Sequence, residues 1–134
     1  MKKCVIIYNP NSGKGKVKDN LVDIVNLINS YDYDVEVIAT KYKGHAINIV
    51  KDIDSNVDLV MSFGGDGTFN EVMRGNFLRR KKIVLAHIPV GTTNDIGAMF
   101  GYGKNILRNV KLTLDGEVKE MDICTINGPP FIYV

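Results

Sequence analysis

The sequence contains no tryptophan and only two cysteines and two histidines in 134 residues. Cys4 and Cys124 each lie in an apolar, strand-like run, which favours buried, reduced thiols over a disulfide framework or a zinc site. The apolar run after Lys2 and Lys3 ends at Tyr8, so it is too short for a signal peptide or a membrane span. We therefore expect a soluble, cytoplasmic chain whose contact with membranes is peripheral.

The sequence also lacks a large excess of charge of either sign, because it has 17 basic and 15 acidic residues and a net charge of +2. Basic and aromatic residues do not interleave as they do on surfaces that bind single-stranded nucleic acid, so no nucleic-acid partner is expected. With 45% hydrophobic residues, a chain of this length should form one domain that buries roughly two thirds of its unfolded surface.

Two local clusters of basic residues depart from this balance. One comprises Lys14, Lys16 and Lys18, and the other comprises Arg79, Arg80, Lys81 and Lys82, with Arg74 upstream. Basic residues at the end of a helix complement its dipole, and this is one interpretation of the second cluster. The other interpretation is attraction to anionic lipid headgroups.

Apolar runs and helical periodicity alternate along the chain. The expected strands are Lys3–Tyr8, Asp34–Ala39, Val57–Phe63 and Ile83–Ile88. The expected helices are one with Val17, Leu21, Ile24, Val25 and Ile28 on one face, Gly44–Ile53, one from Phe69 with Val72, Met73 and Phe77 on its inner face, Thr93–Phe100 and Asn105–Leu114. This order predicts an α/β fold with a parallel sheet covered by helices on both faces.

The tail changes character and predicts a pair of strands. Glu117–Ile126 alternates, Asn127-Gly128 is typical of a hairpin turn, and Phe131–Val134 begins a further strand. We expect this last apolar strand to pair with another chain, as in a homo-oligomer, or to fray.

Three glycines surround one aspartate after the third predicted strand, in the run Gly64-Gly65-Asp66-Gly67-Thr68. Glycines let phosphates approach the backbone and allow positive φ angles that aim N–H groups at one point. The following helix adds its partial positive charge. A carboxylate beside phosphates is repulsive unless a divalent cation lies between them, so Asp66 indicates Mg²⁺ chemistry.

A purely structural interpretation of the same run is a helix start. Asp-Gly is a common turn dipeptide, and Thr68-Phe69-Asn70-Glu71 fits a capping box with Thr68 as N-cap and Glu71 reaching back. Both interpretations can hold together, but capping does not explain three glycines.

The parallel sheet predicts that several loops converge at the carboxyl ends of the strands. Small, hydroxylated and glycine residues follow the first, third and fourth strands, and Thr40, Lys41 and His45 follow the second. Such an edge suits a nucleoside triphosphate. Gly13-Lys14-Gly15-Lys16 lacks the spacing of a Walker loop, and no G-x-G-x-x-G follows a strand, which excludes a P-loop NTPase and a standard dinucleotide fold.

Four motifs carry a family resemblance. They are Asn9-Pro10-x-Ser12-Gly13, Thr40 with Gly44-His45-Ala46, Gly64-Gly65-Asp66-Gly67-Thr68-x-Asn70-Glu71, and Pro89-x-Gly91-Thr92-x-Asn94-Asp95. In this order they resemble the catalytic domain of diacylglycerol kinases and bacterial lipid kinases. The resemblance implies a three-layer, Rossmann-like fold of the phosphofructokinase and NAD kinase kind, ATP and Mg²⁺ as cofactors, and a lipid alcohol at the inner membrane face as acceptor.

The resemblance also implies site residues. Those expected to contact ATP are Asn9, Pro10, Ser12, Gly13, Lys14, Thr40, Gly64, Gly65, Asp66, Gly67, Thr68, Asn70, Glu71, Gly91, Thr92, Thr93 and Asn94. Those expected to hold the metal are Asp66, Asp95 and Asp122.

Structural interpretations stay open for several of these residues. Asp95 can serve in a first helical turn, Asp122 as a strand-end acceptor and Lys14 as a solvated lysine. His45 suits a helix start as well as a phosphate contact, while His87, on an apolar strand, is expected to be packed rather than functional.

The resemblance further implies a second, β-rich domain that supplies the lipid site and the general base. We expect residues 1–134 to be the nucleotide-binding half, inactive without that domain. The last segment matches the family less well, because Tyr133 stands where asparagine is usual. A NAD kinase or phosphofructokinase relative, and a non-catalytic nucleotide-binding module, are the alternatives.

Overall fold

The computed structural model describes residues 1–11, 15–90, 106–116 and 132–133. Its strands are β1 (Lys2–Tyr8), β2 (Tyr33–Ala39), β3 (Leu59–Gly64), β4 (Val84–Pro89) and β5 (Ile132–Tyr133). Its helices are α1 (Lys16–Asp19), α2 (Leu21–Asn29), α3 (His45–Asp52), α4 (Asp66–Phe77) and α6 (Ile106–Asp115). None of the helices in these ranges is long and apolar enough to cross a membrane.

The strands form one sheet in the order β2-β1-β3-β4-β5. The pairs from β2 to β4 are parallel, and β5 lies antiparallel to β4. The chain leaves β1 towards one side for β2 and crosses to the other side for β3, which puts a topological switch point between β1 and β3. Ligands of parallel α/β sheets bind outside the carboxyl ends of strands at such a point.

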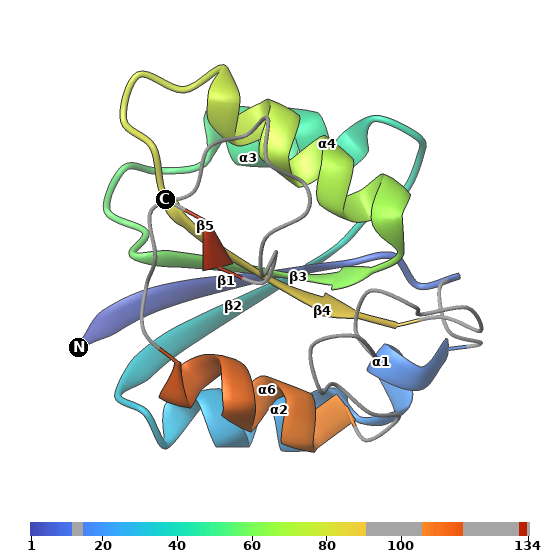
Figure 1. Cartoon of the computed structure of the whole chain (residues 1–134), viewed down its shortest axis with the longest axis vertical. Coiled ribbons are helices and arrows are strands. Elements are labelled where there is room, and N and C mark those ends of the chain that lie inside the picture. The colour runs from blue at the N-terminus through green and yellow to red at the C-terminus, as the bar shows by residue number, and fades with distance from the viewer. Residues whose placement is uncertain (12–14, 91–105, 117–131, 134) are drawn as a thin grey trace.

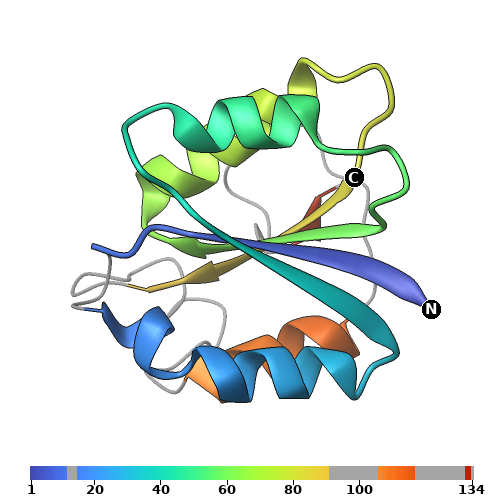
Figure 2. The same cartoon turned by 180° about the vertical axis from the view of Figure 1, so that it is seen from behind.

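Helices cover both faces of the sheet, as the sequence predicts. In Figure 1, α3 and α4 lie above the sheet and α1, α2 and α6 lie below it, and Figure 2 shows the same two layers from behind. Strand β1 serves both layers, since Cys4 and Ile6 pack with Ile24 of α2 while Val5 packs with Val50 of α3. This alternation explains why a continuous apolar run forms a central strand.

The thiol of Cys4 lies within this core. It is fully buried, and burial raises the pKa of Cys4 to about 12. The expected burial is confirmed for Cys4, which is a free cysteine, whereas Cys124 lies outside the described residues.

The single helix expected across Val17 to Ile28 is two helices, broken at Asn20. The Asn20 side-chain amide donates to the carbonyl of Lys16 at 2.7 Å, and that carbonyl is the one a continuous helix would offer to the Asn20 N–H. The N–H of Asn20 bonds to Val17 instead, at 3.1 Å. Asparagine competes with the helix through such local bonds, which accounts for the break.

The inner face of α4 also differs from the prediction. Phe77 was expected on that face, but its side chain is 63% exposed, while Gly75 and Asn76 are buried. A Cβ at Gly75 would lie 2.6 Å from the carbonyl oxygen of Ile47, so α3 and α4 pack closely here. Asn76 exchanges two hydrogen bonds of 2.9 and 3.0 Å with the backbone of Ile83. These contacts fix the rotation of α4 and turn Phe77 outwards.

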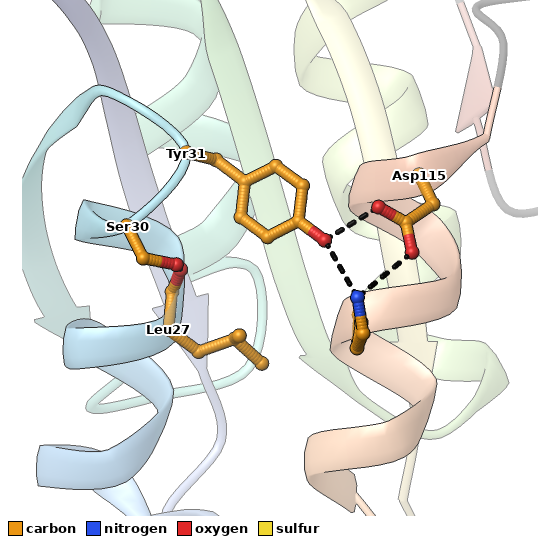
Figure 3. Close-up of polar contacts among 5 residues, drawn as sticks. Leu27, Ser30, Tyr31 and Asp115 are labelled. Carbon is orange, nitrogen blue, oxygen red and sulfur yellow. Dashed lines mark hydrogen bonds and ion pairs between the residues drawn. The ribbon is translucent and has the colours of Figure 1, made fainter.

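A polar cluster joins the two helices of the lower layer (Figure 3). The hydroxyl of Tyr31, which follows α2, donates to Asp115 of α6 at 2.5 Å, and Lys111 lies 3.2 Å from both. The hydrogen bond that Tyr31 donates is the largest cause that lowers the pKa of Asp115, and the hydrogen bond that Lys111 donates to the Tyr31 oxygen is the largest cause that raises the pKa of Lys111. The cluster fixes the end of α6 against the turn that enters β2.

The end of the chain confirms part of the sequence prediction. A strand forms at Ile132–Tyr133, within the predicted range, and it pairs with Leu85 and Ala86 of β4 in the same chain. Because β5 is the last strand of the sheet in the described residues, its other edge is not engaged by this pairing, and the expected contact with another chain stays a prediction. Helix α6 confirms the prediction at 105–114, whereas the helix at 93–100, the strand at 117–126 and the turn at 127–128 lie outside the described residues.

Candidate nucleotide site

The ends of four strands meet at one edge of the sheet, at the right of Figure 1. The N–H of Thr40, after β2, donates to the carbonyl of Tyr8 at 2.9 Å, and the N–H of Asn9 donates to Phe63 at 3.3 Å. After β4, the N–H of Val90 donates to Gly64 at 3.0 Å. These bonds continue the ladder beyond the strands, so the predicted convergence of the loops is confirmed for the described residues.

Helix α4 begins in the middle of the glycine run. Gly65 is the N-cap in an extended conformation, with φ −88°, and the N–H of Phe69 bonds to its carbonyl at 3.2 Å. The capping box is therefore wrong: Thr68 already lies inside the helix, and no side chain caps the start. The first N–H groups of a helix lack intrahelical acceptors, so this end offers donors to an anion.

The glycines are needed for clearance, not for positive φ angles. None of Gly64, Gly65 and Gly67 has a positive φ, which corrects that part of the sequence-based argument. A Cβ at Gly64 would lie 2.6 Å from Thr68 Oγ1, so a side chain at Gly64 would collide with the helix. A Cβ at Gly65 or Gly67 would meet no atom within 4 Å. These two glycines leave open space beside the start of α4.

A cavity of about 370 Å³ lies at this place. It is lined by Asn9, Asn11, Thr40, Lys41, Tyr42, Lys43, Ala46, Gly65, Gly67, Thr68 and Glu71. The structure thus brings six predicted residues to one cavity from the ends of three strands and the first turns of α4. Its volume lies within the usual range for small-molecule sites.

The other predicted residues fall into two groups. Pro10, Gly64, Asp66 and Asn70 adjoin the lining residues in the chain without lining the cavity themselves. Ser12, Gly13, Lys14, Gly91, Thr92, Thr93, Asn94, Asp95 and Asp122 lie outside the described residues.

The loop between β2 and α3 supplies residues that the sequence patterns did not identify as site residues. Tyr42 and Lys43 line the cavity, and Tyr42 stacks on His45 with ring centroids 4.5 Å apart. Nδ1 of His45 accepts the N–H of Lys41 at 2.9 Å, so His45 organises this loop, as its structural interpretation proposed. No sequence pattern marks Tyr42, but its position two residues after Thr40 could have drawn attention to it.

Glu71 binds the loop that leads into α3. Its Oε1 accepts the N–H of Gly44 at 3.1 Å, and Gly44 is the N-cap of α3 with φ 92°. Glu71 therefore does not reach back to the start of its own helix. It holds the loop between β2 and α3, whose residues Lys41, Tyr42 and Lys43 line the cavity as well.

The loop after β1 turns sharply at its described end. The side chain of Asn9 accepts the N–H of Asn11 at 2.9 Å, which is an Asx turn. This bond directs Asn11 into the cavity lining together with Asn9.

His87 lies buried behind the glycine run. Its Nδ1 is 2.7 Å from Ser62 Oγ, and its ring stacks on Phe69 of α4 with centroids 4.6 Å apart. Burial lowers the pKa of His87 to about 3, and the backbone of Gly64 opposes this change in part. Within ordinary hydrogen-bond geometry, Nε2 has no partner in the described part of the chain. The neutral imidazole lies on β4 and packs against Phe69 of α4, so His87 is packed, as the sequence analysis expected.

Of the three predicted metal ligands, only Asp66 is among the described residues. Asp66 is the first residue of α4 and is exposed, whereas Asp95 and Asp122 are not described. Among the residues in view, no three His, Cys, Asp or Glu side chains gather into a metal site. The carboxylate of Asp66 has the oxygen chemistry that Mg²⁺ prefers.

The fold and the cavity define the class of protein: an α/β domain with a ligand-sized cavity at the carboxyl edge of its parallel sheet. Comparison with known proteins identifies the family. Residues 3–126 match the family model described as the diacylglycerol kinase catalytic domain, and the chain belongs to this family.

Individual relatives agree with this assignment. The chain is 35% identical over its whole length to a diacylglycerol kinase of Bacillus subtilis (strain 168), and 34% identical over 98% of its length to that of Staphylococcus haemolyticus (strain JCSC1435). A crystal structure of a diacylglycerol kinase from Bacillus anthracis str. Sterne superposes on 88% of the chain with a TM-score of 0.75 and 35% identity. The chain spans 45%, 41% and 43% of these proteins, respectively.

Proposed function

We propose that this chain is the nucleotide-binding part of a lipid kinase, which transfers the γ-phosphate of Mg-ATP to the hydroxyl of a diacylglycerol-like lipid. The observation that carries the proposal is the cavity at the start of α4, where Gly65 and Gly67 leave space for phosphates in a member of the diacylglycerol kinase family. The relatives bear the name diacylglycerol kinase.

The residues of the cavity suit the binding of a triphosphate. The N–H groups at the start of α4 and the hydroxyl of Thr68 donate to phosphate oxygens. Thr40 adds a second hydroxyl, which makes only a long hydrogen bond of 3.4 Å to the carbonyl of Tyr8. The exposed Lys41 and Lys43 add positive charge from the loop after β2. Phosphoryl transfer depends chiefly on such positioning and on neutralising charge.

Asp66 is the described residue that would hold Mg²⁺, and we propose Asp95 and Asp122 as its partners. When bound, the ion neutralises charge on the phosphates during transfer. Glu71, whose carboxylate lines the cavity, accepts the N–H of Gly44 and is not assigned to the metal.

We further propose that a second, β-rich domain supplies the lipid pocket and the general base, and that residues 1–134 alone are inactive. The relatives are more than twice as long as the stretch they share with this chain. The acceptor then lies at the inner face of the cytoplasmic membrane, which the protein contacts peripherally.

The test is transfer of labelled γ-phosphate from Mg-ATP by the full-length protein to a panel of lipid alcohols, with NAD and sugar phosphates in parallel. We expect a phosphorylated lipid from the wild type and none from Asp66→Asn. Phosphorylation of NAD or a sugar phosphate without a lipid product would instead assign a NAD kinase or phosphofructokinase relative. Nucleotide binding without any product would indicate a non-catalytic module, and lipid phosphorylation by residues 1–134 alone would disprove their expected inactivity.

A further inference from the structure

Two large apolar side chains lie exposed next to each other at the end of α4. Phe77 is 63% exposed and Leu78 is 59% exposed. Arg80 and Lys81 follow them and are exposed as well. We call these four residues the apolar–basic corner. It lies where α4 turns towards β4, at the upper left of Figure 1.

The exposure of Phe77 is fixed by the packing of α4. Gly75 allows the backbone of α3 to come so close that a Cβ would lie 2.6 Å from Ile47 O and 2.9 Å from Val50 Cβ. Asn76 is held by its two bonds to Ile83. A rotation that buried Phe77 would break both sets of contacts, so the side chain stays in solvent.

Two basic residues hold the turn itself. The guanidinium of Arg79 donates to the carbonyls of Val50 and Ile53 at 2.9 and 2.6 Å, and so caps the end of α3. Lys82 Nζ donates to the carbonyls of Phe77 and Arg79 at 2.5 and 2.6 Å. For these two cations the helix-end interpretation of the basic cluster is confirmed.

Arg80 and Lys81 differ from their neighbours. Neither takes part in the ion pairs found among the described residues. No Asp or Glu occurs between Glu71 and Asp95, although Asp52 and Asp54 lie at the end of α3 that Arg79 caps. The corner therefore combines two apolar side chains with a local excess of positive charge.

We propose that the apolar–basic corner docks on the surface of a membrane that contains anionic phospholipid. Exposed apolar side chains insert at the headgroup boundary, and neighbouring cations attract the anionic headgroups. Two side chains are far too few for the roughly 800 Å² per partner of a standard protein interface, but they suffice as a peripheral lipid anchor when cations support them.

The position of the corner fits a role in recruitment. It lies at the opposite end of α4 from the cavity, and a helix of 12 residues is about 18 Å long. Docking therefore leaves the cavity open to nucleotide in water. The proposal concerns binding to lipid surfaces and holds whether or not the protein phosphorylates a lipid.

The test is sedimentation of the full-length protein with vesicles of phosphatidylcholine, with and without phosphatidylglycerol. We expect binding to the anionic vesicles only, with a loss at high salt. Phe77→Ser with Leu78→Ser should weaken this binding about tenfold or more, and Arg80→Gln with Lys81→Gln should weaken it about fivefold for each charge removed. Val22→Ser is the matched control, because Val22 is 73% exposed on α2 in the other helical layer.

Other outcomes overturn the proposal. Equal binding to neutral vesicles, no vesicle binding at all, or equal losses in the Val22→Ser control would each exclude an anionic lipid surface as the partner of the corner. If light scattering showed that only the Phe77 and Leu78 variant changed the molar mass, the corner would be an interface between copies of the chain. Thermal unfolding of each variant confirms that a loss does not come from misfolding.

Discussion

Glu71 Oε1 lies 3.1 Å from the backbone nitrogen of Gly44 and joins helix α4 to the loop that enters α3. Glu71 lines the cavity, and Gly44, the N-cap of α3, follows the lining residue Lys43 in the chain. If the cavity receives phosphates, as we propose, a carboxylate in it is unfavourable by charge, and the loop that Glu71 holds explains its presence. This bond holds the loop before α3 against α4.

Glu71→Ala should weaken nucleotide binding, because the loop with Tyr42 and Lys43 loses its attachment to α4. A hydrogen bond to a charged group contributes about 1.5–3 kcal/mol, so we expect an increase in Kd of roughly tenfold or more. Glu71→Gln keeps an acceptor oxygen and should bind within about threefold of the wild type. Titration of ATP by calorimetry measures both. Equal losses in the two variants would mean that the charge matters, and not the bond to Gly44.

Substitutions of the glycines at the start of α4 should affect protein stability and ATP binding separately. Gly64→Ala places a Cβ 2.6 Å from Thr68 Oγ1 and should lower the free energy of unfolding by about 1–3 kcal/mol. Gly65→Ala meets no atom within 4 Å and should lower the free energy of unfolding by no more than about 1 kcal/mol, the cost of a poorer N-cap, yet weaken ATP binding because the methyl group enters the proposed phosphate space. Urea unfolding and ATP titration of both variants test this. Normal ATP affinity in Gly65→Ala would remove the argument that this space receives phosphates.

The positions of the strands could be predicted from the sequence, whereas the orientation of individual side chains could be predicted much less well. The runs at Cys4–Tyr8 and Leu59–Phe63 are buried in both helical layers, and burial of that kind leaves a continuous apolar pattern. Phe77 fits the helical period equally well but is exposed, because the rotation of α4 is set by the contact of Gly75 with α3. That contact joins Gly75 to Ile47 and Val50, which lie 28 and 25 positions earlier in the sequence, and periodicity within one helix cannot detect it.

Several residues of the cavity could likewise be predicted from the sequence, but not all of their roles. Parallel strands bring their carboxyl ends to one edge, so Asn9, Thr40 and Gly65 could be grouped without coordinates. The role of Glu71 could not be found in this way. Its spacing from Thr68 matches a capping box, and only the tertiary approach of Gly44 supplies the better donor.

Acid should destabilise the domain through His87. The folded state keeps its imidazole neutral down to about pH 3, whereas the unfolded chain binds the proton near the ordinary pKa of 6.5. Between these values the unfolded state holds more protons, so the stability that His87 contributes is complete above about pH 6.5 and is lost as the pH falls. The loss approaches about 1.4 kcal/mol per pH unit.

The measurement is urea unfolding of the wild type and of His87→Gln at pH 7 and pH 5. The variant should be less stable at pH 7, because the stacking on Phe69 is lost, but should depend less on pH. An identical pH dependence in the two proteins would assign the acid sensitivity to other groups.

Cys4 should resist modification while the protein is folded. Its side chain is fully buried and its pKa is raised to about 12, so almost no thiolate exists at neutral pH. Iodoacetamide at pH 8 should therefore label Cys4 only after urea is added, as mass spectrometry of the digested protein would show. Fast labelling of Cys4 in the native protein would mean that β1 opens readily to solvent.

Strand β2 forms one edge of the sheet, and along it Asp34 and Glu36 are exposed and point to the same side. If a second molecule were to extend the sheet there by two-fold symmetry, carboxylates of the two copies would come close together, and the repulsion would oppose the pairing. This strand thus carries its own protection against the edge-to-edge stacking that begins aggregation. Replacing Asp34 and Glu36 with uncharged residues should shorten the time before a concentrated solution of the protein becomes turbid.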